Sequence, residues 1–253
     1  MSRFALPALI AVAVATQFAS AALRHAAFHS TVFDLGIFDQ ALFLLSRGET
    51  PHSSLLGFHI LGDHGALLLY ALHATPYWLL AAQALGVSLG AWPLHRMALA
   101  AGLEARDALL IAAAYLLYPV VYNQSVNDFH PEAFVAPALL GAACSARARR
   151  PASFAACLAL ALACKEMIAL TVAAMGVWLW LAEDRRRFGI AALLVGTGWF
   201  ALVALVLIPR ITGVDAARSI GDGRYGSLGD SIAAIAANVV ADPSLLAREA
   251  VSW

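Results

Sequence analysis

Long apolar runs alternate with short polar segments along most of the sequence. A helix that crosses a bilayer needs about 20 apolar residues, or somewhat fewer where the bilayer thins or the helix end is covered. We therefore predict an all-α fold, a polytopic transmembrane helical bundle of about seven spans. The predicted spans are residues 4–23, 76–100, 107–122, 132–146, 152–164, 167–182 and 188–208.

The first polar region has a pattern of its own. Residues 33–45 are apolar but are interrupted by Asp34 and Asp39, so this segment is too short and too acidic to span. An interfacial, half-buried helix is the expected structure there. Residues 49–64 contain proline, glycines and three histidines, which predicts a loop. A short outer-leaflet helix is then expected over 65–74, before the next span.

The charged residues sort by sign and by place. Arginines gather at 147–150 and at 185–187, whereas acids, histidines and the only lysine lie at the opposite ends of the apolar runs. Under the positive-inside rule the arginine patches are cytoplasmic, which predicts a multi-pass protein of the inner (plasma) membrane with a cytoplasmic N-terminus. The segments predicted to lie outside are 24–63, 123–131 and 209–253.

Two domains follow from this arrangement. Residues 1–208 form the expected transmembrane helical domain, with an outer loop at 24–63. Residues 209–253 are polar and weakly amphipathic and form an expected outer-face tail, which reads as truncated. Residues 19–21 resemble a signal-peptidase site, so a cleaved signal peptide is the alternative for the first run. Both readings place the next segment outside.

Composition supports the bilayer as solvent. The chain is 62% hydrophobic and 13% charged, with a mean hydropathy of +0.77, whereas soluble domains are about half apolar and about a quarter charged. The net charge is +0, so no nucleic-acid partner is expected. The three cysteines lie in apolar runs and are read as small apolar residues without a disulfide.

Four polar segments on the predicted outer face carry the groups that could perform chemistry. Ionisable side chains at membrane depth are costly unless they have partners, so we expect these segments to meet in one outer cavity. An acid and an imidazole close together can also ligate a divalent ion or exchange a proton. The candidate residues are Asp34, Asp39, Asp63, His64, Asn127, Asp128, His130, Glu132, Lys165 and Glu166.

Each of these segments also has a purely structural explanation. Asp34 and Asp63 each precede or open a helical segment and could act as N-caps. Residues 127–132 could form a solvated loop in which Glu132 favours the helix dipole. Lys165 and Glu166 could form a bare turn between two spans, although a turn alone needs no lysine.

A family resemblance rests on four segments in this order and spacing: FDLGIFDQALF, LGDH, NDFHPE and KE. They resemble the bacterial predicted-membrane-protein family called domain of unknown function 2079, over most of residues 28–240. The segment RYGSLGDSI, which begins at Arg224, is similar to that family too. Members of the family are usually longer, so the resemblance implies that this chain is an N-terminal portion, from a truncated or split gene.

That family is in turn distantly similar to the C-type membrane glycosyltransferases. Those enzymes place an acidic motif on the first outer loop and move a sugar from a polyprenyl-phosphate carrier to an acceptor. The similarity implies that Asp34 or Asp39 is a general base or a metal ligand, and that Lys165, oriented by Glu166, neutralises the departing phosphate. It also implies a divalent metal or phosphate at Asp128, His130 and Glu132, and substrate binding by Asp63, His64, Asn127 and Arg224.

The resemblance thus implies a glycosyltransferase whose partners are membrane lipid and a polyprenyl-phosphate-sugar donor. A membrane transporter is the first alternative, although a transporter would need charges near the bilayer midplane, and these charges lie at one end of the spans. A non-catalytic membrane protein or fragment is the second alternative.

Overall fold

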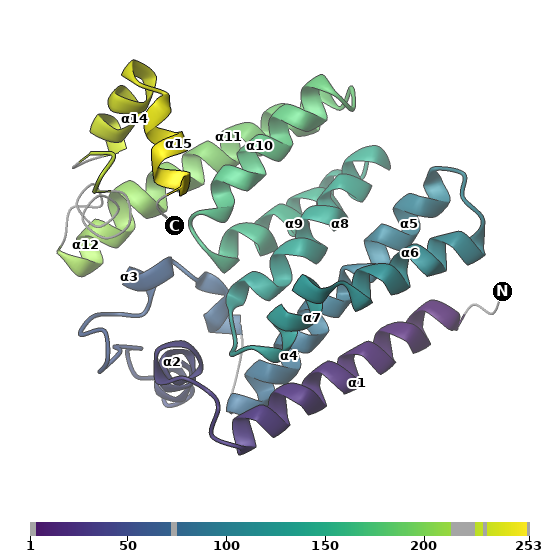
Figure 1. Cartoon of the computed structure of the whole chain (residues 1–253), viewed down its shortest axis with the longest axis horizontal. Helices are drawn as coiled ribbons and strands as arrows, with labels where there is room; N and C mark the ends of the chain where they lie inside the picture. The colour runs from purple at the N-terminus through teal and green to yellow at the C-terminus, as the bar shows by residue number, and fades with distance from the viewer. Residues whose placement is uncertain (1–3, 72–74, 214–225, 230–231, 252–253) are drawn as a thin grey trace.

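The computed structural model describes residues 4–71, 75–213, 226–229 and 232–251, and within these ranges the chain is helical, without a β-strand (Figure 1). The all-α prediction is confirmed. All three cysteines are free, as expected.

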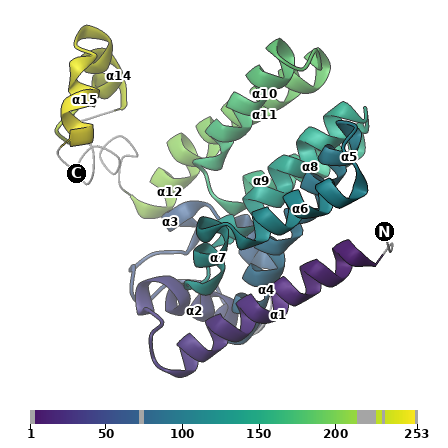
Figure 2. The ribbon, with the colours of Figure 1, turned by 45° about the vertical axis from the view of Figure 1, so that its right-hand side comes forward.

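Three antiparallel hairpins form the body of the molecule. They are α5 (Ala91–Ala100) with α6 (Ala105–Leu117), α8 (Val135–Arg147) with α9 (Pro151–Cys164), and α10 (Ile168–Leu181) with α11 (Arg186–Leu202). The N-terminal helix α1 (Ala5–Ala26) lies along α4 (Pro76–Leu89). Both views show the three hairpin turns at the end of the bundle where α1 begins (Figures 1 and 2).

Glycine allows the α10–α11 hairpin to pack backbone against backbone. A Cβ atom at Gly176 would lie 2.5 Å from the backbone nitrogen of Leu193, and one at Gly189 would lie 2.6 Å from the carbonyl oxygen of Gly176. Small residues at helix contacts are typical of membrane bundles, where close approach replaces the hydrophobic driving force. Any side chain at these glycines would separate the two helices.

The opposite end of the bundle holds shorter elements. A π-helical turn, η1 (Val32–Gly36), continues into α2 (Ile37–Ser46), and the short helix α3 (Leu61–His64) is followed by a 3-10 turn, η2 (Leu67–Ala71). The helix α7 (Pro119–Val126) and the turn η3 (Pro131–Phe134) complete this end. A helix is therefore present over most of 33–45, as predicted, and its inner face buries Ile37, Phe38, Ala41 and Leu42.

Fewer described helices than predicted are long and apolar enough to cross a membrane. Two helical segments are long and apolar enough to cross a membrane, Ala5–Ala26 and Arg186–Thr212. The second combines α11 with a π-helical turn, η4 (Val203–Leu207), and α12 (Ile208–Thr212). The bent pair α6–α7 would be a third. A helical membrane protein fits the described residues, but about seven spans is not confirmed, because α9 and α10 have only 14 residues each.

Two further helices, α14 (Ile232–Ala241) and α15 (Ser244–Val251), lie in the predicted tail. Helical structure therefore extends into the region beyond residue 208, where the sequence shows only weak amphipathic patterning.

Candidate functional site

The polar segments of four loops meet at the end of the bundle where α2, α3 and α7 lie (Figures 1 and 2). Their ionisable side chains form three contacts across sequence-distant segments. These contacts are Lys165 Nζ to Glu132 Oε1 at 2.8 Å, His64 Nδ1 to Glu166 Oε2 at 4.0 Å, and His130 Nε2 to Asp34 Oδ1 at 3.6 Å. Lys165, Glu132 and His130 also act electrostatically on His64, so the contacts belong to one cluster. We call it the polar-end cluster.

The Lys165–Glu132 ion pair occupies the centre of this cluster. Lys165 follows the last turn of α9 in extended backbone, and Glu132 lies in η3 directly after a proline. Burial acts to raise the pKa of Glu132, but the hydrogen bond and the charge of Lys165, together with a backbone hydrogen bond and the charge of His130, hold that pKa below its ordinary value. Glu132 is therefore a carboxylate at neutral pH, and the charge of the only lysine is partly balanced.

A second, more buried pair lies beside the first. The side chain of Glu166 is 13% exposed, and burial raises its pKa to about 7. Burial also lowers the pKa of His64, whose Nε2 lies 3.5 Å from Asp63 Oδ2. His64 Nδ1 and Glu166 Oε2 are both buried without a hydrogen-bond partner, and each faces the other. A buried polar atom without a partner is costly, so this pair is a place where a proton, a water molecule or a ligand atom can be held.

Backbone hydrogen bonding links the two loops that carry this pair. The amide of Glu166 donates to the carbonyl oxygen of His64 at 3.3 Å. Gly65 then turns the chain with φ +56, and its hydrogen atom replaces a Cβ that would meet Val203 at 2.6 Å. Asp63 lies inside α3, whose N-cap is Ile60 without a side-chain cap bond, so the N-cap explanation of Asp63 is wrong.

His130 and Asp34 form the accessible edge of the cluster, since their side chains are 41% and 44% exposed. His130 Nδ1 lies 2.9 Å from the carbonyl oxygen of Asp128, which can only accept. That contact places the proton on Nδ1 and leaves Nε2 as the basic nitrogen facing Asp34. Thr31, not Asp34, is the N-cap: its hydroxyl accepts from the amide of Asp34 at 3.2 Å and donates to the Asp34 carboxylate at 2.7 Å.

The carboxylate of Asp128 is held in place by hydrogen bonds from two other segments. Its carboxylate accepts from Arg24 Nη1 at 2.8 Å and from the amide of Thr31 at 2.6 Å. Burial acts to raise the pKa of Asp128, but the hydrogen bonds from Thr31 and Arg24 hold it below its ordinary value. The last turn of α1 is thereby joined to the loop before η3. Phe129, fully buried, stacks edge-on against Phe38 of α2 at 5.5 Å and holds the same loop from the other side.

Gln83 organises this loop and is a residue that the sequence analysis did not identify. Its buried side-chain amide donates to the carbonyl oxygens of Gln124 and Asn127, both at 2.9 Å, and its Oε1 accepts from the amide of His130 at 2.8 Å. The sequence feature that could have identified Gln83 is a lone side-chain amide in an otherwise apolar run. In such a run a polar side chain needs a partner.

We expect Gln83→Met to destabilise the protein by about 2–4 kcal/mol, because several buried backbone groups lose their partner at once. The amides of residues 127–130 should then exchange with solvent faster. Thermal unfolding in detergent and hydrogen exchange measure the two effects. The matched control is Gln124→Met, whose side chain makes none of these bonds; an equal loss in the control would remove the special role of Gln83.

Three predicted site residues lie apart from the cluster or outside the described chain. Asp39 is on α2, where burial raises its pKa and the charge acting on it is His25. The side chain of Asn127 is exposed, and the contact of this residue with the site is through its backbone carbonyl. Arg224 lies outside the described residues.

Two of the three predicted metal ligands are paired with cations, and the third, His130, faces Asp34. Asp128 binds Arg24, and Glu132 binds Lys165. Among the residues that the structure describes, no group of three or more His, Cys, Asp or Glu side chains is arranged to hold a metal ion. These side chains as arranged do not fit a divalent ion, so we derive no step through a metal, and its presence stays a prediction.

Comparison with known proteins gives a family. A family model described as "Predicted membrane protein (DUF2079)" matches residues 24–253, which include the whole polar-end cluster. No curated protein and no solved structure matches the chain.

Proposed function

The chain belongs to the DUF2079 family of predicted membrane proteins, and from that premise we propose that it transfers a sugar from a polyprenyl-phosphate carrier to an acceptor at the outer face of the membrane. The observation that carries the proposal is the Lys165–Glu132 ion pair. This ion pair joins the accessible His130–Asp34 pair to the buried His64–Glu166 pair. A cation beside proton-accepting groups is what transfer from a phosphate leaving group requires.

We further propose that the protein crosses the plasma membrane about seven times with its N-terminus inside. In support, the three hairpin turns, which carry or adjoin the arginine patches, gather at one end of the bundle, and the polar-end cluster lies at the other (Figure 2). The positive-inside rule assigns the first end to the cytoplasm. The short helices α9 and α10 then cross where the bilayer is thinned.

Cysteine labelling tests this orientation. In a cysteine-free background, Asn123→Cys on α7 is expected to react with a membrane-impermeant thiol reagent from outside, and Ala148→Cys in the α8–α9 turn only after permeabilisation. Both positions are exposed, so accessibility to solvent does not bias the comparison. Equal reaction of the two positions in intact cells would contradict the orientation.

The chemical step is assigned to the accessible edge. The acceptor hydroxyl gives its proton to His130 Nε2, and Asp34 stabilises the imidazolium that forms. The hydroxyl oxygen forms a bond to the anomeric carbon while the bond from that carbon to the phosphate oxygen breaks. The electron pair leaves with the polyprenyl phosphate, and Lys165 neutralises the added charge. Of the two acids in the FDLGIFDQALF segment, we assign Asp34, because Asp39 has no contact with His130 or Lys165 among the described residues.

A proton-coupled transporter is the second candidate, and one observation favours it. The row of titratable groups leads from the exposed Asp34 to the buried His64–Glu166 pair, where two polar atoms lack partners. Such a row can pass protons.

One experiment separates the two functions. The protein in proteoliposomes is supplied with radiolabelled polyprenyl-phosphate sugars, and transfer and proton leak are measured together. Transfer that His130→Gln and Lys165→Met reduce to background, and that Arg47→Gln leaves unchanged, is the expected result. Arg47 is the control because it pairs with Glu49 on the same loop, away from the cluster. Proton leak that depends on Glu166, without sugar transfer, would replace the transferase by a transporter.

A further inference from the structure

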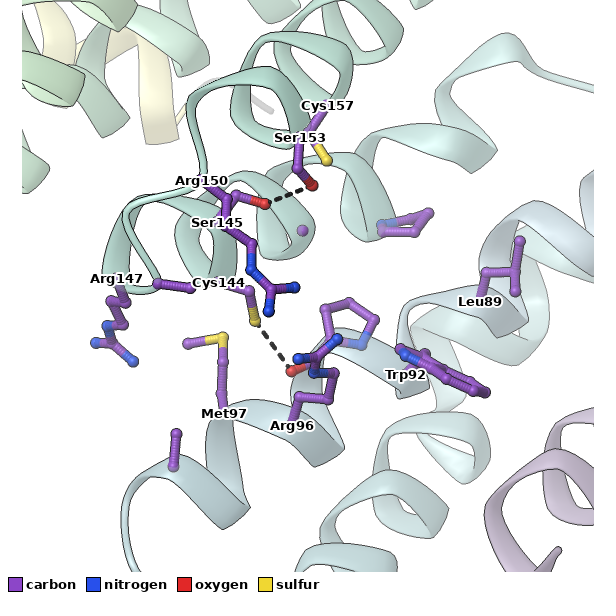
Figure 3. A pocket seen from close by; sticks show the side chains of 15 residues that line it. Leu89, Trp92, Arg96, Met97, Cys144, Ser145, Arg147, Arg150, Ser153 and Cys157 are labelled. Carbon is purple, nitrogen blue, oxygen red and sulfur yellow. Dashed lines mark hydrogen bonds between the residues drawn. The ribbon is translucent and has the colours of Figure 1, made fainter. Parts of the chain in front are cut away.

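A cavity lies at the end of the bundle opposite the polar-end cluster. It has a volume of about 490 Å³ and lies between α5 and the α8–α9 hairpin. Its walls combine apolar side chains, among them Trp92 and Met97, with the guanidinium groups of Arg96, Arg147 and Arg150. Figure 3 shows Arg96 and Arg150 reaching toward the middle of this pocket from its two walls, whereas Arg147 points away.

The charges of the three arginines are not equally available. Arg147 donates two hydrogen bonds to Glu183, at 2.8 and 2.6 Å, and lies over the ring of Trp178. In the described part of the chain, no acidic side chain lies within ion-pair distance of Arg96 or Arg150. Both guanidinium groups are exposed and give the pocket a positive charge that an anionic occupant complements.

An apolar groove adjoins this pocket. The groove has a volume of about 460 Å³ and lies between the first half of α1 and the end of α4. Leu89 and Trp92 line both cavities, so pocket and groove share a wall. The groove is lined by apolar residues of α1, such as Ile10 and Val14, and has no ionisable side chain. A ligand that fills both must have an anionic head and an apolar tail.

We propose that this pair of cavities binds an anionic phospholipid, with its phosphodiester headgroup between Arg96 and Arg150 and an acyl chain in the α1–α4 groove. Arg96 and Arg150 supply charge complementarity to the phosphate, and basic pockets between helices on the cytoplasmic side are a recurrent form of lipid headgroup site. The planar guanidinium groups suit phosphate oxygens better than an ammonium would. The proposal does not rest on sugar transfer, because the cavity shares no residue with the polar-end cluster.

The test compares two lipids with identical chains. The full chain in detergent is titrated with palmitoyl-oleoyl phosphatidylglycerol and with palmitoyl-oleoyl phosphatidylcholine, and bound lipid is counted by native mass spectrometry. Phosphatidylglycerol is expected to bind more tightly. Arg96→Gln/Arg150→Gln should weaken its binding by about 30-fold, which is about 2 kcal/mol for two cations, and should weaken phosphatidylcholine less, because the choline cation of that lipid already balances its phosphate.

Matched variants isolate the site from general charge. Arg106→Gln/Arg187→Gln removes two exposed cations at the same end but outside the pocket, and should leave both affinities unchanged. Arg96→Lys/Arg150→Lys keeps the charge and should retain the preference. Ala15→Trp, which obstructs the groove, should weaken the binding of both lipids.

Four results would overturn the proposal. The first is equal affinity for the two lipids, and the second is an equal loss in the control variant. The third is full displacement of phosphatidylglycerol by millimolar inorganic phosphate, which would identify a soluble anion as the occupant. The fourth is a dimer that disappears in the Arg96/Arg150 variant, which would assign the pocket to a second copy of the chain.

Discussion

Replacing Lys165 with methionine is expected to reduce sugar transfer by about 10²–10³-fold, the usual effect of removing one group that stabilises transition-state charge. The substitution should also destabilise the protein by about 1–3 kcal/mol, since the half-buried Glu132 carboxylate is left without its hydrogen-bond donor. Activity is measured by transfer from the polyprenyl-phosphate donor and stability by thermal unfolding in detergent at neutral pH.

A double variant separates the two effects. In Lys165→Met/Glu132→Gln no unpaired charge remains, so stability should recover while transfer stays at background. The control is Arg47→Met, which breaks an exposed ion pair with Glu49, and exposed pairs contribute only about 0–1 kcal/mol. If the double variant regains transfer together with stability, Lys165 acts in folding and not on the phosphate.

Glu166 is expected to contribute a loss of stability as pH rises, opposite in sign to the contribution of His64. Its folded-state pKa of about 7 lies above the ordinary 4.5, so the folded protein binds this proton more tightly than the unfolded chain does. The stabilisation is fully present below pH 4.5 and is lost as pH rises to about 7. The loss amounts to at most roughly 3 kcal/mol over that window.

Glu166→Gln should remove this slope, because glutamine stays neutral at every pH. At pH 8 the variant is therefore expected to unfold at a higher temperature than the parent chain, and thermal unfolding between pH 5 and pH 8 measures both curves. Glu104→Gln, which replaces an exposed carboxylate before α6, is the control and should keep the slope. A variant curve parallel to that of the parent chain would show that Glu166 is ionised throughout.

The sequence pattern predicted the elements of this fold better than the contacts between them. Apolar runs ended by arginines predicted helices and the turns between them, and the two charges at 165–166 predicted a polar site. The ion-pair partners of these charges could not be predicted, because they are distant in sequence. Lys165 pairs with Glu132 across 33 positions, and Arg24 pairs with Asp128 across 104. A one-dimensional pattern shows that a buried charge needs a partner, but only the packing of helices selects which one.

One interpretation of local structure was wrong for a different reason. Asp34 looked like an N-cap because an acid before an apolar run often is one, but Thr31 offers a hydroxyl three residues earlier and occupies that position. About seven spans, several of them short, were expected from hydropathy and the positive-inside rule. Among the described residues, two or three helical segments are long and apolar enough to span, and α9 and α10 have 14 residues each, so that number is not confirmed.

The shortness of α9 and α10 has a consequence for the lipids around them. At a rise of about 1.5 Å per residue, each 14-residue helix is about 21 Å long, whereas the hydrocarbon layer is about 30 Å thick. With the orientation proposed above, this hydrophobic mismatch draws the outer headgroup layer inward beside the α9–α10 turn. If the proposed transfer takes place there, a prenyl-linked phosphate in that depression reaches the level of Lys165 while its chain remains in the membrane, and we expect the rate of transfer to depend on bilayer thickness.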